Sequence, residues 1–162
     1  MKCPICRTGV LETRRENHHY TESGLSNVVL LDIEVERCPH CDERMPAIPR
    51  IEQLHRVIAF ALAEQKGRLS GEEVRFLRKY LGLSGLHFAR TIGVDQATVS
   101  RWENNKDPIG PTADRLLRLM VLTRPPVQEY ALENLADVAQ DDAPPLQLGV
   151  KVAETGWQVA RA

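Results

Sequence analysis

Residues 83–105 of this 162-residue chain read LSGLHFARTIGVDQATVSRWENN, and they predict two short helices joined by a tight turn. Ser84 stands where a side chain can cap the first helix, and Gly93 supplies the positive φ that the turn requires. Asp95 can then cap a second helix, which we expect over Gln96–Glu103. This arrangement is that of a helix-turn-helix.

Each of the two predicted helices has one apolar face. We expect Leu86 and Ala89, with Phe88 beside them, to face inward from the first helix. Val99 and Trp102 fall on one side of the second helix and leave its other side polar. In a helix-turn-helix that binds DNA, the first residues of the second helix enter the major groove. The polar side is therefore the candidate DNA-reading surface. The alternative is a helical hairpin that only completes an all-α core.

The side chains on this polar surface have the chemistry that DNA recognition needs. The Gln96 amide can pair with adenine through two hydrogen bonds, and the Arg101 guanidinium can pair with guanine in the same way. Hydroxyl and ammonium groups nearby can hold phosphates. The predicted DNA-binding residues are Gln96, Ala97, Thr98, Ser100, Arg101 and Lys106, with Thr98, Ser100 and Lys106 at phosphates.

The run from residue 96 to 104, Gln-x-Thr-Val-Ser-Arg-Trp-Glu-Asn, resembles the second-helix signature of the Xre and phage-repressor family of helix-turn-helix domains. The sequence departs from that family at Gly85, where a glutamine that contacts phosphate is usual. The resemblance therefore implies DNA binding with a weaker backbone anchor from the first helix, or with His87 in that role.

Charge is distributed unevenly along the chain. The total is −1, but residues 68–125 carry ten basic against six acidic residues, a net charge of +4. Residues 126–162 carry two basic against six acidic, a net −4, and residues 1–67 carry nine against ten, a net −1. The positive charge thus lies on the segment with the helix-turn-helix, as a phosphate-bearing partner requires.

Composition and hydropathy predict a cytoplasmic protein without a membrane segment. The hydrophobic content of 43% and the charged content of 27% are typical of globular domains. The longest apolar run, Val57–Ala63, is far too short to span a bilayer, and no secretory signal precedes it.

All four cysteines lie in two knuckles, Cys3-Pro-Ile-Cys6 and Cys38-Pro-His-Cys41. Two CxxC turns on separate strands bring four thiolates to one point, which suits tetrahedral zinc. We therefore predict one structural Zn²⁺ held by Cys3, Cys6, Cys38 and Cys41 in a zinc ribbon. A pair of disulfides and a thioredoxin-like redox motif are the alternatives, and a cytoplasmic address and the missing βαβ context oppose them.

The histidines do not add a catalytic centre. His18, His19 and His40 are interpreted as surface residues, because four cysteines already fill the coordination shell. A closed site of this kind has no open position for water, and no serine–histidine–aspartate set or phosphate-binding glycine loop is evident. The sequence therefore predicts that the protein is not an enzyme.

The remaining segments complete an α+β fold in which a small zinc-ribbon β domain is joined to an all-α, five-helix helix-turn-helix domain. Strands are expected over Gly9–Arg15 and Leu25–Val35. Further helices are expected over Ile51–Lys66, after a capping box at Ser70-Gly-Glu-Glu73, and from Pro111. The predicted domains are 1–67, the ribbon with its connecting helix; 68–125, the DNA-binding domain; and 126–162, an acidic helix (Val127–Ala139) and tail.

Taken together, the Met-Lys-Cys-Pro-x-Cys start, the second CxxC near residue 40, the connecting helix and Ser100-Arg101-Trp102-Glu103 resemble the MqsA antitoxin family, which joins a YgiT-type zinc finger to an Xre-type domain. The resemblance covers about residues 1–125. It implies a homodimer through the helix-turn-helix half that binds a palindromic double-stranded DNA operator and represses its own operon. It also implies that the zinc half binds and blocks a ribonuclease toxin.

Carried over by residue, the resemblance makes the four cysteines zinc ligands and Arg101 a base-reading residue. The second base-reading position of the family is an asparagine, and Ala97 stands there in this sequence. We therefore expect a different operator, with Gln96 taking over the reading. A stand-alone zinc-ribbon and Xre-type regulator with no toxin partner is the alternative.

Overall fold

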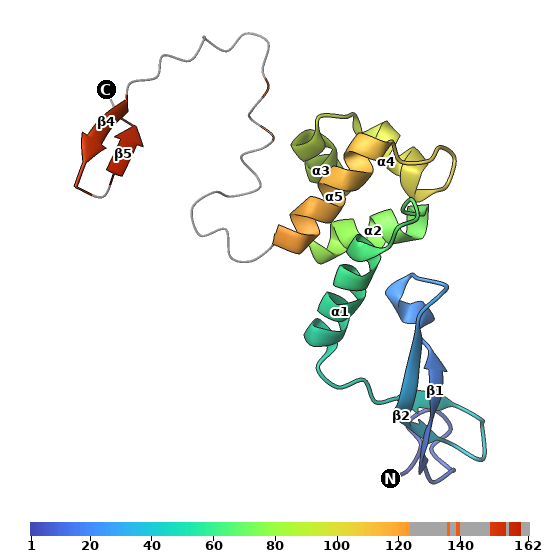
Figure 1. Cartoon of the computed structure of the whole chain (residues 1–162). Helices are drawn as coiled ribbons and strands as arrows, with labels where there is room; N and C mark the ends of the chain where they lie inside the picture. The colour runs from blue at the N-terminus through green and yellow to red at the C-terminus, as the bar shows by residue number, and fades with distance from the viewer. Residues whose placement is uncertain (124–135, 137–138, 140–149, 155, 160–162) are drawn as a thin grey trace.

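A three-stranded antiparallel sheet is followed by five helices in the computed structural model, which describes residues 1–123, 136, 139, 150–154 and 156–159 (Figure 1). The sheet consists of β1 (Glu12–His19), β2 (Val29–Arg37) and β3 (Arg44–Pro46). The helices are α1 (Ile51–Glu64), α2 (Gly71–Tyr80), α3 (Gly85–Ile92), α4 (Gln96–Glu103) and α5 (Pro111–Thr123). The predicted α+β class is confirmed.

The sheet differs from the prediction in where its strands begin. β1 starts at Glu12 because Gly9 belongs to the first knuckle, where its carbonyl accepts the Cys3 N–H. β2 starts at Val29 because a 3₁₀ turn at Thr21–Ser23 and a loop precede it. β3, which pairs with the end of β2, was not predicted. As expected, β2 leads directly into Cys38.

The predicted caps are present at the helices that form the helix-turn-helix half. The Ser84 hydroxyl accepts from His87 N at 3.1 Å, and Ser70 does the same for Glu73 N at 3.4 Å. The Asp95 carboxylate accepts from Thr98 N at 2.7 Å. Gly93 has a φ of 80° between α3 and α4, so the turn uses the left-handed conformation that glycine allows. α4 has the predicted bounds.

The core confirms the predicted inward faces of α3 and α4 except at Leu86. Phe88, Ala89, Val99 and Trp102 are buried, but Leu86 is 40% exposed. On α1, Ile58 and Leu62 are buried whereas Val57 is 61% exposed. On α2, Arg78 is turned away from solvent, because Glu103 and the Leu83 carbonyl bind its guanidinium.

The tip of the β1–β2 hairpin packs against the helices (Figure 1). Leu25 is 1% exposed in the same apolar cluster as Ile58 of α1. The Tyr20 hydroxyl lies 2.9 Å from His55 Nε2 of α1. Ser26 donates to Glu72 of α2 through both its N–H and its hydroxyl. The sheet and the helical half therefore share a contact surface, and the domain boundaries drawn from sequence stay a prediction.

Past α5 the structure describes only short pieces. β4 (Val150–Ala153) and β5 (Gly156–Val159) form an antiparallel hairpin. The predicted acidic helix and linker fall almost wholly outside the described residues. Within the described part of the chain, no helix is both long and apolar enough to cross a membrane.

Candidate functional site

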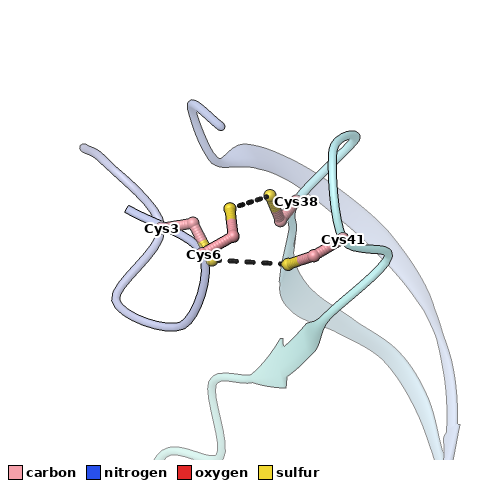
Figure 2. Close-up of side chains that lie close together, drawn as sticks. All are labelled: Cys3, Cys6, Cys38 and Cys41. Atoms are coloured by element: carbon pink, nitrogen blue, oxygen red, sulfur yellow. Dashed lines mark hydrogen bonds between the residues drawn. The ribbon is translucent and has the colours of Figure 1, made fainter. Parts of the chain in front are cut away.

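The two cysteine knuckles meet at one end of the sheet and form a compact group of four sulfur atoms (Figure 2). All four Sγ atoms lie within 4.8 Å of one another. The Cys3–Cys41 and Cys6–Cys38 Sγ distances are 3.7 and 3.6 Å. Four sulfurs at about 2.3 Å from a central ion in tetrahedral array stand about 3.8 Å apart. The cysteines are therefore positioned to hold a metal ion.

The two knuckles have the same backbone design. The N–H of the residue after the second cysteine returns to the first cysteine's carbonyl, from Arg7 to Cys3 and from Asp42 to Cys38, at 2.9 Å in both cases. Arg7 and Asp42 take positive φ values of 60° and 58°. This turn aims both thiols of a knuckle at the same point. The repeated geometry shows that each CxxC sequence forms the same local structure although the flanking residues differ.

Gly9 and Thr8 support the first knuckle, and the sequence analysis did not identify them. Hydrogen bonds from the Thr8 side chain and the Gly9 N–H lower the pKa of Cys6 to about 5. The Gly9 Cα is so close to the second knuckle that an added Cβ would lie 2.4 Å from Cys38 Sγ. A glycine three residues after a knuckle is the sequence signal that would have indicated this contact.

Replacing Gly9 with alanine should weaken metal binding. The new methyl group would collide with Cys38 Sγ, and the Gly9 N–H to Cys6 bond would have to shift with it. Disturbing the groups that hydrogen-bond to metal ligands and orient them typically lowers metal affinity about 10- to 100-fold. Competition against a chromophoric chelator measures the change. Gly67→Ala is the control, because nothing lies within 4 Å of that position; equal affinities for both variants would contradict the argument.

The histidines lie outside the cysteine group in the described residues. His18 Nε2 is 3.0 Å from Glu22, and His19 Nε2 is 2.6 Å from the Ser26 carbonyl oxygen. His40 Nδ1 is 3.3 Å from Thr8 Oγ1 and so connects the second knuckle to the segment that follows the first. The only group of three or more potential ligands that the described residues form is the four cysteines.

The predicted DNA-binding residues lie on the outer side of α4 and in the loop that follows it. Five of them are exposed, namely Gln96, Ala97, Ser100, Arg101 and Lys106. Thr98 is half-buried, and hydrogen bonds from its N–H and side chain lower the pKa of Asp95. Thr98 thus has a local role in capping α4, and its contact with phosphate stays a prediction.

The inner side of α4 fixes the helix in place. Trp102 is buried in the core. Glu103, whose side chain is 9% exposed, accepts from Arg78 Nε at 2.5 Å and from Arg75 Nε at 3.3 Å, so it links α4 to α2. The sequence analysis did not assign this role to Glu103. A rigid attachment of this kind lets α4 present its outer side in a defined orientation.

The family model described as "Antitoxin component of bacterial toxin-antitoxin system, MqsA" matches residues 1–128. The match includes both knuckles, the three-stranded sheet and helices α1 to α5. No curated protein sequence matches the chain significantly.

Proposed function

The chain belongs to the MqsA antitoxin family, and on that premise we propose that it represses transcription by binding a DNA operator through α4 and neutralises a ribonuclease toxin through its N-terminal half. The observation that carries the DNA-binding part is the exposed polar side of α4, held by a capped turn on one end and by Trp102 and Glu103 beneath. Family membership carries the toxin-binding part.

The proposed metal is a single structural Zn²⁺ bound by Cys3, Cys6, Cys38 and Cys41. Four thiolates in a tetrahedral arrangement are a donor set that zinc prefers, and the sulfur positions suit it. When bound, the ion would cross-link the start of the chain to the end of β2. Cys3 and Cys38 are 1% and 0% exposed, whereas Cys6 is half-buried and Cys41 is exposed, so the ion would have two of its four ligands withdrawn from solvent.

A homodimer through the helix-turn-helix half is also part of the proposal. One chain presents one recognition helix, and the net charge of +4 on residues 68–125 is modest. Two copies would place two α4 helices in successive major grooves, about 34–36 Å apart, and read a palindromic site. Sedimentation of the protein alone and with operator DNA tests this stoichiometry.

Two substitutions should separate base reading from phosphate binding. Arg101→Ala should cost roughly 1–3 kcal/mol and relax the sequence preference at one base step, because it removes a two-bond contact to guanine. Lys106→Ala should weaken binding to all sequences alike and reduce the salt slope by about one. Fluorescence anisotropy with operator and scrambled duplexes at several salt concentrations measures both. Identical behaviour of the two variants would show that the roles are wrongly assigned.

Recovery of the intact, metal-loaded protein from a lysate of its own host tests both halves of the function. The expected result is its own promoter together with a small ribonuclease. Promoter DNA without a protein partner would favour a stand-alone transcriptional regulator and overturn the toxin-binding half. Failure to recover specific DNA would overturn the repressor half.

A further inference from the structure

Asp107 holds the guanidinium of Arg101 from one side. Arg101 Nε donates to Asp107 Oδ2 at 2.6 Å, and the two side chains are 60% and 48% exposed. The pair lies on the outer side of the helix-turn-helix half, at the residue proposed to read guanine. An ion pair this exposed contributes little to folding. Its main effect is therefore expected on the Arg101 side chain itself.

The loop that carries Asp107 is fixed at both ends. Asn105 takes a φ of 54°, and its Oδ1 accepts from Gly71 N of α2 at 2.9 Å. Lys106 N donates to the Arg101 carbonyl at 2.9 Å. Ile109, two residues past Asp107, is 1% exposed. The Asp107 carboxylate therefore has a defined place relative to α4.

The contact uses Nε and leaves the outer edge of the guanidinium open. Guanine offers O6 and N7 as a pair of acceptors, which the two terminal nitrogens of arginine match. A carboxylate at this position also repels nearby phosphates. We propose that Asp107 is a positioning and specificity-determining residue, which orients Arg101 toward guanine and lowers affinity for non-cognate DNA. This inference rests on the proposed operator binding by α4.

The test is Asp107→Asn in the full-length, metal-loaded protein, measured by anisotropy against the operator and against duplexes changed at each guanine in turn. Removing an exposed ion pair of this strength corresponds to about a 2- to 5-fold effect. We expect discrimination at one guanine to fall by that factor and affinity for scrambled DNA to rise. Glu12→Gln, the same charge change at the start of β1, is the matched control and should alter neither ratio.

A double variant separates positioning from charge. In an Arg101→Ala background, Asp107→Asn should still raise affinity for scrambled DNA but should no longer change discrimination at any guanine. A loss of discrimination that persists without Arg101, or unchanged discrimination in the single variant, would overturn the inference. If the wild-type protein itself showed no preference for any duplex, the failure would lie with the proposed function, so the two can be told apart.

Discussion

Removing the metal should unfold the three-stranded sheet while the helix-turn-helix stays folded. The sheet has little apolar core of its own, since every residue of β1 is exposed or half-buried and β2 buries only Leu30 and Val35. Structural zinc sites of small domains contribute apparent binding free energies of about 10–16 kcal/mol, which become folding free energy. Without that contribution, residues 1–46 lack the buried area to stay ordered.

Cys38→Ser is the sharpest form of this experiment, because Cys38 is fully buried and the substitution removes one of the four sulfur ligands. In an NMR spectrum, we expect the amide signals of sheet residues such as Val35 to move into the narrow range of chemical shifts of an unfolded chain. The signals of Val99 and Leu117 should stay dispersed. Chelator treatment of the wild type should give the same spectrum, and added Zn²⁺ should reverse it.

His40→Ala is the matched control, since it changes the same knuckle but removes only the contact to Thr8. It should keep the metal and the sheet. Operator binding should survive Cys38→Ser, while capture of a toxin should be lost. Loss of operator binding as well would show that the contacts of Tyr20 and Ser26 with α1 and α2 make the two halves fold as one unit.

The features that sequence predicted correctly are those coded by neighbouring residues. Ser84, Gly93 and Asp95 act within one helical turn of their own positions, so the turn and the bounds of α4 could be read directly. The two CPxC knuckles are equally local, and their doubling indicated that they meet at one site. Such signals do not depend on how distant segments pack.

The features that sequence missed depend on contacts between distant segments. Arg78 looks like a surface residue on α2, but its contacts with Glu103, 25 positions later, and with the Leu83 carbonyl keep it from solvent. The sequence of a short helix also leaves open which of its faces turns inward. Leu86 and Phe88 are both apolar, and packing against the neighbouring helices decides that Phe88 enters the core. The link from Arg101 to Asp107 depends on a loop whose fold has no repeating pattern.

The second large effect is expected from Asp114→Ala, which should destabilise the helix-turn-helix half by about 3–5 kcal/mol. The Asp114 carboxylate is buried in α5 and accepts from Leu69 N at 2.8 Å and from Arg118 Nε at 2.6 Å. Arg118 in turn donates to the carbonyls of Gln65 and Gly67. These bonds fasten the α1–α2 connection to α5, and the alanine variant would leave a half-buried guanidinium and a buried N–H without their acceptor.

Chemical denaturation followed by the far-UV circular dichroism of the helices measures this loss. Arg115→Ala, one residue further along α5 and exposed, is the control and should change the free energy of unfolding by no more than about 0.5 kcal/mol. The double variant Asp114→Leu with Arg118→Met should recover part of the stability, because it removes the carboxylate and the guanidinium together and leaves neither charge without its partner. A loss below about 1 kcal/mol in Asp114→Ala would mean that water replaces the carboxylate, and that apolar packing between α1 and α5 alone holds the connection.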